Sequence, residues 1–226
     1  MISKIINDLH SELPATVKLV AVSKFHPFES IEEAYSAGQR IFAESRPQEL
    51  QAKVKRLETE RPDMSDIRWH FIGHLQTNKL KMVLPYASLV QSVDSVRLLD
   101  AIESWAAAND RKIRVLLEPH VAAEQTKQGF SEEEVYSVLE SASKGAYPHV
   151  VFCGIMGMVT FTDDQEIVRS DFAALRRIFD NCRMRFQDLT QDFVELSIGM
   201  SDDYPLAIEY GSTMVRIGSM IFGERI

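Results

Sequence analysis

Residues 18–44 read KLVAVSKFHPFESIEEAYSAGQRIFAE, and this stretch joins two kinds of hydrophobic pattern. It begins with Lys18–Lys24, an apolar run of the length of a buried strand. Residues 27–38 then repeat apolar side chains at helical spacing and end at Gly38, a residue that often terminates a helix. A second short apolar run, Arg40–Glu44, follows directly. The stretch therefore predicts a strand, a helix and a second strand parallel to the first.

This unit recurs along the chain. Further strand-length runs alternate with helical segments such as Val96–Ala108 and Ile167–Phe186. The eight candidate strands are Lys18–Lys24, Arg40–Glu44, Arg68–His74, Leu89–Asp94, Arg114–His120, Val151–Met158, Phe193–Met200 and Met214–Phe222. Strict alternation predicts a parallel sheet with helices outside it. Because there are eight units, we expect an α/β fold with a single (β/α)8 TIM barrel over residues 1–226; an open doubly wound sheet is the alternative.

Length and composition agree with one barrel. The chain has 226 residues, of which 45% are hydrophobic and 26% charged, and a barrel of this kind needs about 200–250 residues. Apolar side chains recur at helical spacing in residues 2–13, so this segment predicts an extra amphipathic N-terminal helix rather than a signal peptide. No stretch approaches the ~20 apolar residues that span a bilayer.

Charge and cysteine content narrow the classes of function. A net charge of −8 argues against a broad nucleic-acid surface, which needs clustered Lys and Arg. One bound phosphate is still compatible with it, because a few backbone N–H groups can hold an anion. Cys153 and Cys182 lie far apart, so neither a disulfide scaffold nor a zinc site is expected, and a cytosolic location is the default.

Polar residues gather where the predicted strands end. In barrels of this class, the rim at the carboxyl ends of the strands carries the chemistry. The residues at this rim are Lys24, Glu44, Ser45, His74, Asp94, His120, Ser201 and Arg216. Lys24 alone is more simply interpreted as a surface lysine, although a desolvated rim lysine would be nucleophilic toward an aldehyde.

The last two predicted strands contain a second constellation. Arg216 lies among apolar residues, where a guanidinium requires an acceptor, and Gly218-Ser219 allows close approach of a backbone to an anion. Ser201 is expected to be the N-cap of a helix that runs through Ala207. With Gly218 and Ser219 it would form a phosphate cup from the loops after strands seven and eight. Barrel closure would bring this cup beside Lys24.

Two histidines lie four residues apart in the third predicted strand. On a strand, His70 and His74 would be ~13 Å apart at ~3.3 Å per residue, too far to share one metal ion. We therefore predict no metal site. His74 is expected at the functional rim, and His70 near the start of the strand.

Five segments of the chain resemble the YggS/PROSC family of pyridoxal-phosphate-binding proteins, the PLP homeostasis proteins. They occur in family order over nearly the whole chain and are residues 19–24 (LVAVSK), 70–79 (HFIGHLQTNK), 199–203 (GMSDD), 215–219 (VRIGS) and 221–225 (IFGER). The resemblance implies a barrel similar to the N-terminal domain of alanine racemase.

The resemblance also implies the cofactor, pyridoxal phosphate, and the residues that bind it. Lys24 matches the lysine of the Schiff base, and Arg216 the arginine that faces the pyridine nitrogen. The residues that match the surroundings of the cofactor phosphate are Met200, Ser201, Gly218 and Ser219. Because an arginine is a permanent donor, it should leave the ring nitrogen unprotonated and the cofactor a weaker electron sink. His74 is a further rim residue that we expect to contact the cofactor.

The chain departs from the family pattern at the rim. Ser45 stands where the family usually has asparagine, in Phe-Ala-Glu-Ser instead of Phe-Gly-Glu-Asn, and His120 replaces the usual asparagine after strand five. The following loop keeps Glu124, Lys127 and Gly129. These changes leave the expected cofactor contacts in place but weaken any inference about amino-acid preference.

The resemblance implies a non-catalytic carrier or buffer of pyridoxal phosphate, acting indirectly on amino-acid and keto-acid metabolism. The alternative is a weak amino-acid racemase with Lys24 as base, and a third reading is a class I aldolase without cofactor. A racemase needs acid–base groups on both faces of the substrate, which alanine racemase obtains from a second domain. Since the sequence ends three residues after Gly223, we expect no such domain. We expect a monomer, with small amino acids as further ligands and with no nucleic-acid or membrane partner.

Overall fold

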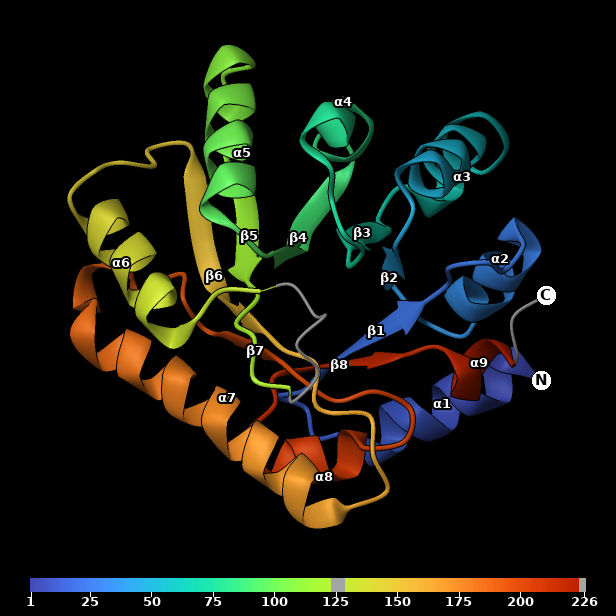
Figure 1. The fold of residues 1–226 in the computed structure, drawn as a ribbon. Helices are drawn as coiled ribbons and strands as arrows, with labels where there is room; N and C mark the ends of the chain where they lie inside the picture. Colours follow the sequence, from blue (N-terminus) through green and yellow to red (C-terminus); the bar gives the residue numbers. More distant parts are fainter. Residues whose placement is uncertain (123–128, 224–226) are drawn as a thin grey trace.

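The computed structural model describes residues 1–122 and 129–223, and their eight strands close into a barrel (Figure 1). The strands are β1 (Lys18–Val22), β2 (Ile41–Glu44), β3 (Arg68–Phe71), β4 (Ala87–Val93), β5 (Ile113–Leu117), β6 (Val150–Met156), β7 (Glu195–Ser197) and β8 (Met214–Ile217). Each strand is parallel to its neighbours in sequence order, and β8 closes onto β1 with Val20 opposite Arg216. The predicted (β/α)8 barrel is confirmed, and the alternative prediction of an open doubly wound sheet is wrong.

Helices surround the barrel. They are α1 (Ile2–Glu12), α2 (Phe28–Ser36), α3 (Pro47–Glu60), α4 (Leu80–Val83), α5 (Val96–Ala108), α6 (Glu132–Ser143), α7 (Gln165–Arg185), α8 (Tyr204–Glu209) and α9 (Ser219–Phe222), with single 3-10 turns at Pro62–Met64, Thr77–Lys79 and Gln187–Leu189. Helix α6 begins with a capping box, in which Ser131 and Glu134 satisfy each other's backbone N–H groups. The predicted N-terminal helix is α1, which packs beside α2 and α9.

Two apolar layers follow from the alternation of side chains along each strand. Leu19 and Ala21 of β1 belong to a large cluster that includes the buried faces of the helices, whereas Val20 and Val22 belong to a small cluster formed by strand residues alone. The small cluster therefore fills the barrel interior, and the large one lies between strands and helices.

The strands end earlier than the sequence predicts. We expected the first strand to reach Lys24, but β1 ends at Val22 and Lys24 lies in a turn. Likewise β3 ends at Phe71 rather than His74, and the last predicted strand divides into β8 and the short helix α9. At each of these places the chain leaves the barrel wall, so Lys24 and His74 lie beyond their strands, whereas Glu44 and Arg216 remain within β2 and β8.

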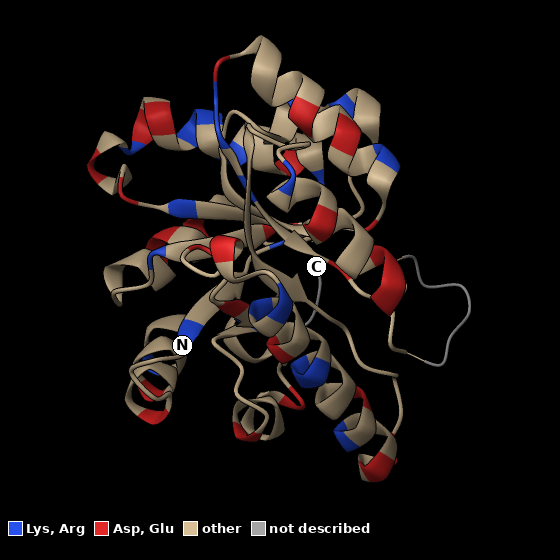
Figure 2. Cartoon of the chain, turned by 90° about the vertical axis from the view of Figure 1, so that its left-hand side faces the viewer, with Lys and Arg blue, Asp and Glu red and all other residues tan. Residues whose placement is uncertain are grey.

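The distribution of surface charge and the state of the two cysteines can be compared with what the composition predicts. In the view of Figure 2, acidic and basic residues are interspersed along the outer helices. Cys153 and Cys182 are free and buried. Within the described part of the chain, no helix has the length and apolar content to cross a membrane, and no three His, Cys, Asp or Glu side chains are grouped as metal ligands.

Candidate functional site

A cavity of about 580 Å³ opens at the carboxyl ends of β1, β6, β7 and β8. Six of the residues singled out in the sequence line it, namely Lys24, Met200, Ser201, Arg216, Gly218 and Ser219. The other lining residues, which were not among the predicted site residues, are Val22, His26, Ile72, Met156, Met158, Asp202 and Gly223. The fold therefore brings together the ends of the first and last strands, as barrel closure requires.

Arg216 forms part of the cavity wall through a buried guanidinium. Its Nη1 donates to the carbonyl oxygen of Ser197 (2.6 Å) and to Ser197 Oγ (2.8 Å), and its Nη2 donates to the carbonyl oxygen of Gly157 (3.0 Å). Burial lowers the pKa of Arg216 to about 10, against the opposing effect of Glu118 and Asp203. The side chain therefore remains a charged donor at neutral pH.

A chain of neutral hydrogen bonds continues below Arg216 into the barrel. Ser197 Oγ donates to Gln91 Oε1 (2.7 Å), and the other end of the Gln91 amide lies 2.8 Å from His70 Nδ1. Burial, with smaller effects from Arg68 and Lys18, lowers the pKa of His70 to about 3. His70 is therefore neutral, so its Nδ1 can accept from Gln91. We expected His70 near the start of the strand, and it lies within β3 with its side chain in the barrel interior.

Two serine hydroxyls meet at the cavity, one from the loop after β7 and one from the first residue of α9. Ser201 Oγ lies 3.1 Å from Ser219 Oγ. We expected Ser201 to be a helix N-cap, but that position belongs to Asp203. The Asp203 carboxylate accepts from the backbone N–H of Met200 (2.5 Å), which leaves the Ser201 hydroxyl available to the cavity. A pair of hydroxyls at this distance suits one small anion such as a phosphate.

Gly199 allows the loop before Ser201 to turn. Its φ is +95°, a region that disfavours residues with a Cβ, and an added Cβ would lie only 2.6 Å from Ala207 Cβ. Helix α8 can therefore pack directly under the loop.

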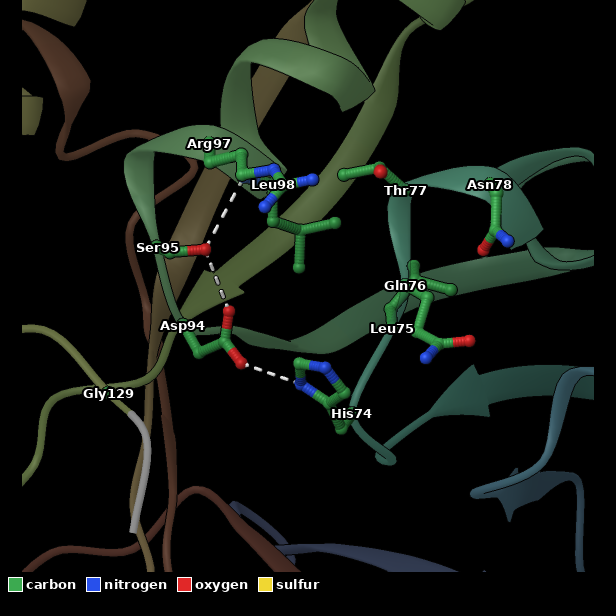
Figure 3. Close-up of a pocket in the computed structure, with 10 residues that line it drawn as sticks. All are labelled: His74, Leu75, Gln76, Thr77, Asn78, Asp94, Ser95, Arg97, Leu98 and Gly129. Carbon is green, nitrogen blue, oxygen red and sulfur yellow. Dashed lines mark hydrogen bonds and ion pairs between the residues drawn. The ribbon is translucent and has the colours of Figure 1, made fainter. Parts of the chain in front are cut away.

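His74 lies in a separate cavity of about 750 Å³. Its Nδ1 is 3.0 Å from Asp94 Oδ2, and Figure 3 shows that the other carboxylate oxygen of Asp94 is bonded to Ser95. The structure thus does not bring His74 to the cavity of Lys24. The two residues that depart from the family pattern at the rim, Ser45 and His120, do not line that cavity either. Glu124 and Lys127 lie outside the described residues.

The Lys24 cavity has the chemistry of a site for a flat phosphorylated carbonyl compound. The two hydroxyls suit its phosphate, the Lys24 amine suits its carbonyl carbon, and the buried Arg216 offers a donor to an acceptor on the ring. Val22, Ile72 and Met156 supply apolar walls, as small-molecule sites usually require.

Comparisons with known proteins agree with this geometry. The family model of the alanine racemase N-terminal domain matches residues 2–226. The pyridoxal phosphate homeostasis protein of Homo sapiens is 38% identical over 225 residues, covering 95% of this chain and 79% of the relative. That of Aquifex aeolicus is 37% identical over 208 residues, covering 92% and 87%. The chain belongs to the pyridoxal phosphate homeostasis protein family.

Solved structures place the homeostasis family among known folds. PipY of Synechococcus elongatus PCC7942, solved with PLP bound, has a TM-score of 0.89 and 32% identity over 99% of this chain and 100% of its own. An alanine racemase of Clostridium difficile 630 has a TM-score of 0.77 at 14% identity, covering 99% of this chain and 56% of the racemase. The racemase likeness shows a shared barrel fold only.

Proposed function

We propose that this homeostasis-family protein binds pyridoxal phosphate in the Lys24 cavity and acts as a carrier or buffer of the cofactor. One observation supports this most directly: a lysine, a buried arginine and a pair of serine hydroxyls line a single cavity. A homologue of known structure, PipY, has been solved with PLP bound.

The residues have separable roles in this proposal. Lys24 holds the cofactor through a Schiff base, and Ser201 and Ser219 hydrogen-bond its phosphate. Arg216 donates to the pyridine nitrogen and, as a permanent cation, keeps that nitrogen unprotonated. When bound, the cofactor supplies an aldehyde that exchanges between amines, and a ring without its proton is a poor electron sink. These features favour holding and exchange over turnover.

The positions of the nearby tyrosines also favour a carrier over a racemase. A racemase needs a second acid–base group on the face opposite the lysine. In α8 and directly after it, Tyr204 donates to Glu12 Oε1 (2.8 Å) and Tyr210 packs on the ring of Phe172. None of the described residues that line the cavity is a tyrosine.

Borohydride reduction of the protein loaded with pyridoxal phosphate, followed by peptide mass mapping, tests the proposal. We expect one phosphopyridoxyl group, attached to Lys24, and no such adduct in the Lys24→Ala variant. A reference variant, Lys55→Ala, removes an exposed lysine of α3 and should retain the adduct. Stoichiometric modification at any other lysine would refute the assignment.

Turnover measurements test the alternative of a weak racemase. The loaded protein is incubated in D2O with L- and D-alanine, and deuterium at the α-carbon is followed by NMR. The carrier proposal expects exchange no faster than with free cofactor. Exchange that is faster and is abolished in Lys24→Ala would establish the racemase instead.

Three finer features belong to the same proposal. Small amino acids are the amines expected to exchange with Lys24. A change in the visible Schiff-base absorption when an amino acid is added would detect this exchange. We propose that the protein acts as a monomer, and light scattering that gave the mass of a dimer would contradict this. We also propose a cytosolic location, which agrees with the two free, buried cysteines.

A further inference from the structure

Lys24 lies in a turn with an unusual backbone conformation. Residues Ser23, Lys24, Phe25 and His26 form this turn, which is closed by a hydrogen bond from the His26 N–H to the Ser23 carbonyl oxygen (3.1 Å). Phe25 has a φ of +67°. Positive φ at the third residue of a turn is usually supplied by glycine, and a bulky residue in this conformation is strained. Surrounding contacts must therefore hold the turn.

Three side chains outside the turn supply such contacts. Lys53 Nζ donates to the Ser23 carbonyl oxygen (2.8 Å), and the Phe25 N–H donates to Glu49 Oε1 (2.7 Å). Ser23 Oγ donates to Glu44 Oε1 (2.6 Å). The turn is thus fixed on both sides of Lys24, at its preceding and its following residue.

The same three side chains form one buried ionic cluster. Lys53 Nζ lies 2.8 Å from Glu44 Oε1 and 2.9 Å from Glu49 Oε1. The exposed fractions are 8% for the Lys53 side chain and 0% for that of Glu44. Among the described residues, Glu44 Oε2 is the one buried side-chain polar atom that no hydrogen bond satisfies. Buried ion pairs are often no more stabilising than apolar side chains of similar volume, so stability alone does not account for this cluster.

The cluster does not line the Lys24 cavity. Along β2, Ile41 and Ala43 belong to the interior cluster and Phe42 to the cluster under the helices, so Glu44 points toward the helix layer by alternation. None of its three members is among the residues that line the cavity. Whatever the cluster does to a ligand, it must do through the turn.

We propose that Glu44, Glu49 and Lys53 are positioning residues that hold the Ser23–His26 turn in its strained conformation and thereby aim the Lys24 amine into the cavity. The proposal rests on the function proposed above, since it needs a carbonyl ligand at Lys24. Its physical basis is orientation: a reacting group displaced by about 1 Å can lose much of its rate advantage. The cluster should therefore affect the covalent step more than non-covalent binding.

Two ligands distinguish the covalent step at Lys24 from non-covalent binding in the cavity. Pyridoxal 5′-phosphate can bond to Lys24, whereas pyridoxine 5′-phosphate has an alcohol in place of the aldehyde and can only bind non-covalently. The variant Glu49→Ala removes the acceptor of the Phe25 N–H at a partly exposed position. Its matched control is Glu58→Ala, which removes an exposed carboxylate from the same helix.

In Glu49→Ala we expect pyridoxal phosphate to bind about 5- to 10-fold more weakly, the effect of one lost hydrogen bond, and its visible Schiff-base absorption to develop more slowly. Pyridoxine phosphate should bind within twofold of the original protein. Glu49→Gln keeps an oxygen acceptor for Phe25 and should restore most of the affinity for the aldehyde. Glu58→Ala should leave both ligands unaffected.

The proposal is overturned if Glu49→Ala binds pyridoxal phosphate as Glu58→Ala does. It is also overturned if both ligands weaken equally, because the cavity as a whole would then have changed. These outcomes are distinct from failure of the proposed function, in which the original protein would itself yield no borohydride adduct at Lys24.

Discussion

Lys24 and Arg216 face the same cavity, but the protein holds them by opposite means. The turn of Lys24 is fixed from outside the barrel wall by a buried ionic cluster, Glu44–Lys53–Glu49. Arg216 is fixed from inside by backbone carbonyl groups and by a neutral chain through Ser197. Electrostatic changes should therefore affect the first region strongly and the second weakly. The predictions below test this contrast, from the largest expected effect to the smallest.

The largest effect is expected from Lys53→Met. Removing the lysine leaves Glu44 buried without its cation, which typically costs about 3–5 kcal/mol. We expect a loss of this size in the free energy of unfolding at pH 8, measured by urea denaturation. The double variant Lys53→Met/Glu44→Leu removes both charges and should recover most of the stability. A double variant as unstable as the single one would show that packing, and not charge, dominates this region.

Arg216→Leu tests the second region, in which carbonyl groups and Ser197 hold the arginine. If Arg216 donates to the pyridine nitrogen as proposed, the substitution removes a charge-assisted hydrogen bond to the cofactor worth about 1.5–3 kcal/mol. We therefore expect pyridoxal phosphate to bind about 10- to 100-fold more weakly. Because the pKa of Arg216 is about 10, the loss should be the same at pH 6 and pH 8. Fluorescence titration at both pH values measures it. Unchanged affinity would contradict the proposed role of Arg216 in binding the cofactor.

The ionic cluster should give folding stability a specific pH dependence. Burial is the main cause that raises the pKa of Glu44 to about 7, against the opposing effects of Lys53 and Ser23; Glu49 raises it further. In the unfolded chain a Glu has a pKa of about 4.3. The folded protein thus retains a proton that the unfolded chain releases, and this contribution to stability is lost as pH rises through 7.

Glu44→Gln isolates this contribution. The variant cannot titrate at this position, so the stability of the original protein relative to the variant should fall between pH 5 and pH 8. We expect a fall on the order of 1–3 kcal/mol by urea denaturation. His26, whose pKa is lowered by burial and by Lys53, is common to both proteins and cancels to first order. A difference that does not vary with pH would contradict the shifted pKa.

The smallest effect is expected at the paired hydroxyls. Ser201→Ala or Ser219→Ala removes one of the two hydroxyls proposed to bind the phosphate and should weaken binding about 3- to 10-fold. Ser104→Ala removes an exposed hydroxyl from α5 and serves as the control. Pyridoxal without its phosphate should bind these two variants and the original protein equally. If it too binds the variants more weakly, the serines do not act on the phosphate.

The sequence predicted the barrel because alternation of strand and helix patterns depends on local periodicity. It also predicted that Lys24, Ser201, Arg216 and Ser219 would lie together, from the polar strand ends and the expected closure of the barrel, and these four residues line one cavity. The ends of the strands escaped prediction. Nothing local in Ser23-Lys24 indicates a turn, because the turn is held by α3, a helix that comes later in the chain.

The direction of side chains was the second feature that could not be predicted from the sequence. Glu44 and His74 both looked like rim residues, yet Glu44 points outward to Lys53 and His74 belongs to the neighbouring cavity. Directions of this kind depend on register and on loop path. Ser201 was assigned as a cap because its neighbours resemble a helix start. The helix instead begins two residues later, with Asp203 as N-cap, and the Asp203 carboxylate accepts from the Met200 N–H of the preceding loop.

The pairing of β1 with β8 has a consequence for biosynthesis. Lys24 is translated well before Arg216 and Ser219, which line the same cavity. A nascent chain therefore contains Lys24 before it contains the whole cavity. Once the chain is released, a ligand that bridges the first and last strands should favour the closed barrel by mass action. Cofactor supply would then influence how much newly made protein completes folding.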